Sequence, residues 1–152
     1  MTSEFIHSFM LEALTMAYHA LNMDEVPVGA IIVKDSQIIG TGFNQVIKDC
    51  SVSSHAEIKA IHEASQALQN YRLVNCDLYV TLEPCHMCAK AIVDARINNL
   101  YFGALEPRTG AVQSVDRFFD RKHLNHKVKY SGGYLEESSA RLLRTFFRSK
   151  RD

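Results

Sequence analysis

Apolar side chains recur at helical spacing in three stretches of the chain, and each stretch predicts an amphipathic helix. The first covers residues 3–22, with Ser3 available as its cap, and the second covers residues 55–68. The last covers residues 135–148 and is expected to turn these side chains inward: Leu142, Leu143, Phe146 and Phe147. A further helix is predicted from Pro84 to about residue 96, because proline is suited to the first turn of a helix.

Between these helices, short runs rich in β-branched and aromatic residues predict strands. Residues 28–33 and 38–43 are separated by a four-residue turn and predict a hairpin. Further strands are expected at 77–82, 100–104 and, more weakly, 128–130, with a polar loop at 44–54, a loop at 106–110 and a short helix at 116–120. A hairpin followed by alternating strands and helices predicts an α/β fold, a three-layer α/β/α sandwich with a mixed five-stranded sheet. Its later strands should be parallel, with right-handed connections.

Composition limits the class of protein. With 152 residues, 47% of them hydrophobic, and only seven glycines and three prolines, the chain fits one domain over residues 1–152. No apolar run approaches the roughly 20 residues that a membrane span needs. The N-terminus lacks the basic segment of a signal peptide, and four cysteines suit a reducing compartment, so we expect a cytoplasmic protein without a membrane partner.

The formal net charge of zero conceals an uneven distribution of charge. No Lys or Arg precedes Lys34, whereas residues 108–152 hold 11 Lys and Arg against 5 Asp and Glu. The cationic residues are densest at the end of the chain: Arg141, Arg144, Arg148, Lys150 and Arg151. Such a cluster is either a phosphate-binding surface or the solvated face of a terminal helix.

The candidate chemistry lies in a split motif, His-Ala-Glu at 55–57 and Pro-Cys-His-Met-Cys at 84–88. His55, Cys85 and Cys88 supply one imidazole and two thiolates, a ligand set that suits Zn²⁺. Three protein ligands leave one tetrahedral position for water, which distinguishes a catalytic zinc from a structural one. Glu57 is then placed to move a proton between that water and a substrate, and this order and spacing are typical of base deaminases.

The local structure predicted for both half-motifs supports this interpretation. His55 and Cys85 each fall where a helix begins, and the positive end of a helix favours a thiolate. Cys85 and Cys88 are three residues apart and therefore share one helical face. His55 and Glu57 are two apart, so that one can bind a metal while the other addresses the bound water.

Less reactive alternatives exist for several of these residues. Cys50 or Cys76 could complete a closed structural site, although both are expected to be small, partly buried apolar residues. His86 could be an alternative ligand, but it should point away from the face shared by the two thiols. Asn44 follows a strand on the approach to the motif, where an asparagine is either turn chemistry or part of the site.

The motifs resemble those of the cytidine deaminase-like superfamily and, within it, the bacterial tRNA-specific adenosine deaminases. The resemblance extends from about residue 25 to residue 151. It is carried by the metal motif and by segments such as Glu25-Val26-Pro27-Val28-Gly29-Ala30, Asn70-Tyr71-Arg72-Leu73, Thr109-Gly110-Ala111 and Phe146-Phe147-Arg148.

This resemblance implies a homodimer with one Zn²⁺ per subunit that converts adenosine to inosine at position 34 of a tRNA anticodon loop. It implies His55, Cys85 and Cys88 as metal ligands and Glu57 as the proton shuttle. For the substrate, it implies that Asn44 hydrogen-bonds the base, that Val28 and Ala56 line the pocket, and that Arg72, Asn125 and the last helix contact neighbouring nucleotides, some across the dimer.

Two other functions compete with this one. A deaminase of a free base, nucleoside or nucleotide, such as cytosine, guanine or deoxycytidylate, would share the metal motif. A zinc-stabilised RNA-binding module without catalysis would share the fold and the basic tail. Segment 70–73 and the basic tail favour a macromolecular substrate over a free nucleoside, and Glu57 disfavours the non-catalytic module.

Overall fold

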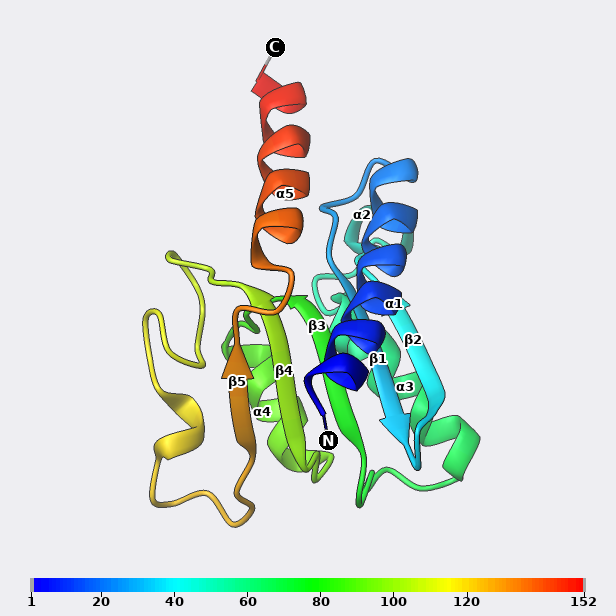
Figure 1. Ribbon diagram of the computed structural model, residues 1–152, viewed down its shortest axis with the longest axis vertical. Helices are drawn as coiled ribbons and strands as arrows, with labels where there is room; N and C mark the ends of the chain where they lie inside the picture. Colours follow the sequence, from blue (N-terminus) through cyan, green and yellow to red (C-terminus); the bar gives the residue numbers. More distant parts are fainter. Residues whose placement is uncertain (1, 152) are drawn as a thin grey trace.

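The computed structural model describes residues 2–151 and contains one mixed five-stranded sheet between two layers of helices (Figure 1). In chain order the elements are α1 (Ser3–Asn22), β1 (Gly29–Lys34), β2 (Gln37–Phe43), α2 (Val46–Asp49), α3 (Ala56–Leu68), β3 (Asp77–Leu82), α4 (His86–Asp94), β4 (Asn99–Ala104), the 3₁₀ turn η1 (Phe118–Asp120), β5 (Lys129–Gly132) and α5 (Glu136–Arg151). The predicted fold class is confirmed, and each predicted helix and strand is present within a few residues.

The strand order is β2-β1-β3-β4-β5. β1 pairs antiparallel with β2 and with β3, whereas β3, β4 and β5 are parallel, as predicted for the later strands. The hairpin turn places Asp35 and Ser36 at positive φ (52° and 61°), the pair of left-handed residues that a two-residue hairpin turn requires.

Alternation along the strands divides the core between the two faces of the sheet. Ile31, Val33 and Tyr79 pack on α1, while Ile32, Leu78 and Val80 belong to the larger cluster under α3 and α4. The first turn of α5 packs against β4 on the same face as α1, and the rest of α5 extends past the carboxyl ends of β4 and β5 (Figure 1).

Gly42 brings α3 unusually close to the sheet. A Cβ at this position of β2 would collide with the backbone of α3 at Ala56 and Ala60. The contact fixes the first turn of α3, which carries His55 and Glu57, relative to the end of the hairpin.

Three local expectations differ from the structure. The 44–54 loop contains a one-turn helix, α2, whose first N–H groups at Ile47 and Lys48 donate to the buried carboxylate of Glu25. The helix predicted from Pro84 begins two residues later, because Cys85 occupies its N-cap. Phe147 was expected to face inward, but its side chain is 46% exposed.

No helix of residues 2–151 is long and apolar enough to cross a membrane.

A candidate metal centre and its cavity

The two halves of the motif meet where α3 and α4 begin. His55 is the N-cap of α3 and Cys85 is the N-cap of α4, and both have extended backbone (ψ 156° and 178°) that turns the side chain toward the opposite helix. Cys88 lies in the first turn of α4 and is fully buried. His55 Nδ1 lies 3.7 Å from Cys85 Sγ and 3.5 Å from Cys88 Sγ, and the three ligand atoms all lie within 4.8 Å of one another.

These distances fit one tetrahedral ion. With Zn–S near 2.3 Å and Zn–N near 2.0–2.1 Å, tetrahedral angles place nitrogen and sulfur about 3.6 Å apart. Hydrogen bonds from the Cys88 thiol and the His55 ring lower the pKa of the Cys85 thiol to about 3, which favours the thiolate that a metal needs. The donated hydrogen bond and burial raise the pKa of Cys88, and a bound cation would reverse this by displacing the proton.

The alternatives that would close the site are absent from residues 2–151. Cys50 is exposed and its thiol faces Ile47 O at 3.7 Å, while the Cys76 thiol faces Val74 O at 3.6 Å. The His86 ring points away from the thiols toward Asp116, 2.9 Å from Nε2 to Oδ2. Within residues 2–151, the group that could hold a metal therefore consists of three ligands, His55, Cys85 and Cys88.

Glu57 lies in the first turn of α3 with only 4% of its surface exposed. Burial raises the pKa of its carboxyl to about 7. A carboxyl whose pKa lies near neutrality can both accept and return a proton, as a general acid and base must.

A cavity of about 90 Å³ opens beside these groups, and His55, Glu57 and Cys85 form part of its wall. Val28 and Asn44, both expected to contact the base, also line it. Asn44 Oδ1 accepts a hydrogen bond from the backbone N–H of Ala56 (2.8 Å), which orients the amide nitrogen of Asn44 as a free donor. Ala56 was expected in the lining, but it is fully buried and is not among the lining residues.

Five lining residues were not predicted as site residues: Val26, Leu82, Glu83, Glu106 and Thr109. Leu82 and Glu83 lie at the carboxyl end of β3, where ligand sites commonly form in parallel sheets, and Val26 lies shortly before β1 begins. Burial alone would raise the pKa of Glu83, but hydrogen bonds from Gln113, Ser114 and Glu106 lower it. Glu83 is thus a buried anion whose partners lie in the following loop.

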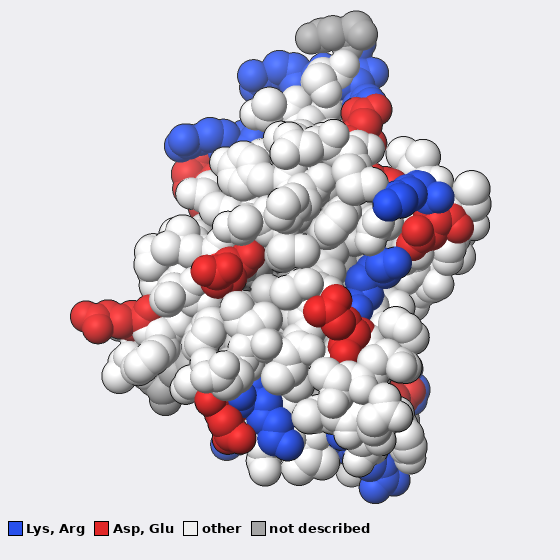
Figure 2. Space-filling view, turned by 90° about the vertical axis from the view of Figure 1, so that its right-hand side faces the viewer, with Lys and Arg blue, Asp and Glu red and all other residues white. Residues whose placement is uncertain are grey.

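A larger basic groove of about 470 Å³ lies between α5 and the 106–108 loop. Its cationic walls come from these residues: Arg108, Arg144, Arg148, Lys150 and Arg151. Phe147 also lines the groove, which explains its exposure. Lys and Arg side chains gather near the C-terminal end of α5 in Figure 2. Glu106 lines both this groove and the cavity, so the two hollows adjoin.

Arg72 and Asn125 lie at the opposite end of the sheet. Leu73, next to Arg72, bonds to Ala95 O shortly before β3 begins, and His126, next to Asn125, contacts Ile97 O just before β4. The six residues of β3 separate this end from the cavity by about 17 Å. Within one subunit, the structure does not bring Arg72 and Asn125 to the cavity.

Residues 3–104 match the family model of the cytidine and deoxycytidylate deaminase zinc-binding region. This match covers the whole of the candidate metal centre and defines the class of protein as a zinc deaminase.

Relatives narrow the class further. The tRNA-specific adenosine deaminase of Haemophilus influenzae is 45% identical over 99% of this chain and 87% of its own length, and that of Agrobacterium fabrum is 48% identical over 94% of both. A solved structure from a study of A-to-I editing by tRNA:A34 deaminases is 44% identical, with a TM-score of 0.86 over 90% of this chain and 99% of that one. The chain therefore belongs to the family of tRNA-specific adenosine deaminases.

Proposed function

We propose that this protein hydrolyses adenosine to inosine and ammonia at position 34 of a tRNA anticodon loop. The observation that carries the proposal is a buried carboxyl, Glu57, in the wall of a small cavity that His55 and Cys85 also line, with Cys88 completing the three-ligand group behind them. The 40–48% identical relatives that bear the name tRNA-specific adenosine deaminase support the choice of substrate.

The residues of this chain divide the chemistry between them. His55, Cys85 and Cys88 would hold Zn²⁺, which when bound supplies water with a pKa near ~7. Glu57 takes a proton from the attacking water and delivers it to a nitrogen of the base, so that oxygen adds to the carbon bearing the amino group. Glu57 then takes the remaining proton of the added hydroxyl and passes it to the amino group, so that the C–N bond breaks, ammonia leaves, the C=O bond of inosine forms and the carboxylate is regenerated.

Asn44 and Val28 orient the base. Because Asn44 Oδ1 is occupied by the Ala56 N–H, the amide nitrogen is the group that can donate to a ring nitrogen of the base. The Val28 side chain, 4% exposed, offers an apolar surface for the flat face of the base. A small enclosed pocket of this kind requires that a loop nucleotide be extruded before it can react.

The basic groove supports an RNA substrate over a free nucleoside. Arg148 and Arg108 have no acidic partner within residues 2–151, so both are available for phosphate, whereas Arg144 is engaged with Glu137. Phe147 presents an exposed aromatic ring among these cations, which is the combination that binds single-stranded nucleic acid. Since this groove adjoins the cavity, an RNA strand can follow it into the site.

The distance of Arg72 from the cavity supports a homodimer. The Arg72 guanidinium stacks on the Tyr71 ring at 5.6 Å, and both side chains are exposed. Arg72, Arg96 and His126 line one hollow in which no carboxylate takes part. These groups lie too far from the cavity of their own subunit to touch a nucleotide beside the target, so Arg72 and Asn125 act on the substrate held by a second subunit. A tRNA substrate also favours a cytoplasmic location.

A substrate panel tests the proposal. The zinc-loaded protein is incubated with an anticodon stem-loop carrying A34, with the same stem-loop carrying adenosine only at other loop positions, and with free guanine, cytosine and cytidine. We expect inosine at A34 alone. Deamination of a free base with no reaction at A34 would contradict the proposal and favour a free-base deaminase.

A further inference from the structure

The segment that carries the two thiols, residues 83–88, also contacts a second part of the protein. Cys85 and Cys88 point toward His55, whereas Glu83 and His86 point toward the chain that runs from β4 to η1. Residues 83–88 thus hold two parts of the protein: Cys85 and Cys88 contribute to the metal centre, and Glu83 and His86 bind the 105–121 segment.

Glu83 is the main attachment. Its Oε1 accepts from the Glu106 N–H (3.0 Å) and from the Ser114 hydroxyl. Its Oε2 accepts from three successive backbone N–H groups, those of Val112, Gln113 and Ser114, at 3.1, 2.8 and 2.9 Å. The carboxylate is 2% exposed, so that water could not accept hydrogen bonds from these donors if the carboxylate were removed.

The segment passes Glu83 as closely as a backbone can. A Cβ at Gly110 would overlap the Glu83 carboxylate. The Gly110 N–H donates to Glu106 O at 2.9 Å, closing residues 106–110 into a turn. That turn presents Glu106 and Thr109 to the cavity and Arg108 to the basic groove. The position of all three therefore depends on one buried carboxylate.

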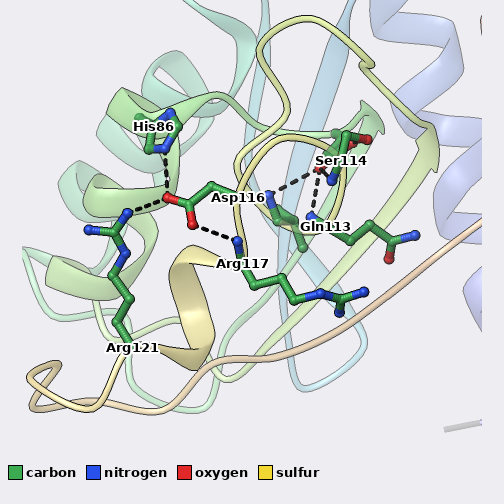
Figure 3. Close-up of polar contacts among 8 residues, drawn as sticks. His86, Gln113, Ser114, Asp116, Arg117 and Arg121 are labelled. Atoms are coloured by element: carbon green, nitrogen blue, oxygen red, sulfur yellow. Dashed lines mark hydrogen bonds and ion pairs between the residues drawn. The ribbon is translucent and has the colours of Figure 1, made fainter.

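His86 makes a second attachment farther along (Figure 3). Its Nε2 lies 2.9 Å from Asp116 Oδ2, and the same carboxylate is held by the Arg121 guanidinium and by the Arg117 N–H (2.7 Å). The His86 ring also packs edge-on against Phe118. The far end of the segment is thereby tied to the residue that follows a metal ligand.

We propose that Glu83 is a positioning residue that sets the substrate-facing turn 106–110, with the His86–Asp116 contact as its second tether. Glu83 lines the cavity, but both of its carboxylate oxygens are taken up by donors of the following loop. It acts through the backbone of the turn, which forms one wall of the cavity and one wall of the groove. This inference rests on the proposed function for its substrate, but the order of the turn can be measured without any substrate.

The primary test replaces Glu83 by glutamine, which has the same shape but presents an NH₂ group to N–H donors. We expect Glu83→Gln to retain one zinc per chain. Trypsin should cleave after Arg108 about tenfold faster, and KM for the A34 stem-loop should rise about tenfold with kcat within about threefold, because buried donors lose their acceptor.

Gly110→Ala disturbs the same contact from the side of the turn and should give the same pattern. Glu12→Gln, an exposed carboxyl on α1, is the matched control.

The result that would overturn the proposal is Glu83→Gln with wild-type proteolysis and wild-type KM, or with zinc lost in step with activity. If Glu83→Gln does not fold, Asp116→Asn decides, since Asp116 lies at the surface. That variant should speed cleavage within residues 108–121 and raise KM about threefold, as expected for loss of one hydrogen bond, and no change would refute the second tether. Failure of the proposed function would appear as no inosine from the wild-type protein, while the proteolysis still reports on the turn.

Discussion

The side chain of Asn44 caps the helix that carries the reacting groups, because its Oδ1 accepts the Ala56 N–H at 2.8 Å. Ala56 lies between His55 and Glu57, so this single bond ties the end of β2 to the centre of the site. The same side chain has an amide nitrogen free to face the cavity that Asn44 lines. The proposed function gives Asn44 a binding role beside this structural one, and substitutions can separate the two.

Asn44→Asp keeps the acceptor for the Ala56 N–H but removes the donor. We expect the melting temperature to stay close to that of the wild type while kcat/KM for the A34 stem-loop falls at least tenfold. Asn44→Ala removes both functions and should in addition lose about 1 kcal/mol of stability, the usual effect of removing a helix cap. Thermal unfolding and steady-state kinetics check the pair, and equal losses of stability in both variants would show that the cap is not the role of Oδ1.

The arginines of α5 should act through phosphate. Replacing Arg144, Arg148 and Arg151 by glutamine should weaken binding of the stem-loop and reduce the slope of log affinity against log salt by about 0.7 for each lost contact with single-stranded phosphate. Fluorescence anisotropy over a salt series measures both quantities. Lys90→Gln is the control, because Lys90 lies on α4 and forms an ion pair with Asp94. An unchanged slope would make the α5 cluster a solvated face.

Asp77 gives a pH-dependent prediction away from the metal centre. Burial raises the pKa of its carboxyl, although Oδ1 accepts from the Asn99 N–H and side-chain amide at 3.2 and 2.9 Å. A raised folded-state pKa means that the folded protein loses stability as Asp77 ionises, from about pH 4 upward. Asp77→Asn keeps the acceptor without the charge, so it should be more stable than the wild type at pH 7 and equal to it below about pH 4. Urea unfolding at both pH values measures the difference, and a variant less stable at pH 7 would contradict this account.

A mixing experiment tests whether Arg72 works across a dimer. Glu57→Gln and Arg72→Ala proteins should each be nearly inactive. After subunit exchange, a heterodimer holds one site in which an intact Glu57 faces an intact Arg72 from the other subunit. Activity should therefore recover to roughly a quarter of the wild-type level, given random pairing of subunits with two-fold symmetry. No recovery, with exchange verified by mass spectrometry, would place Arg72 outside the site of its partner.

The members of the metal centre could be identified from the sequence because each half of the motif is a short local pattern of metal-binding residue types at a helix start, although the two halves lie 30 residues apart. His55, Cys85 and Cys88 occupy helix N-termini, and helix starts can be recognised from proline, capping and apolar periodicity. The roles of Glu83 and Glu25 were not predictable in this way, because their partners are backbone N–H groups 22 to 31 residues away. The positions of Arg72 and Asn125 depend on the strand order, which places the 70–73 and 123–126 segments at the far end of the sheet. Phe147 repeats the apolar period of α5, but only Phe146 of this pair is buried, while Phe147 is 46% exposed and lines the basic groove.

The most direct test of the central claim follows the oxygen atom. The zinc-loaded protein is given the A34 stem-loop in H₂¹⁸O, and the nucleoside at position 34 is analysed by mass spectrometry. Glu57→Gln is the test variant, and Glu63→Gln, on the exposed face of α3, is its matched control. We predict inosine that carries ¹⁸O with the wild type and with Glu63→Gln. Glu57→Gln should bind zinc but react about 10² to 10⁴ times more slowly. Wild-type turnover by Glu57→Gln, or inosine without the solvent oxygen, would contradict hydrolysis by a water that Glu57 activates.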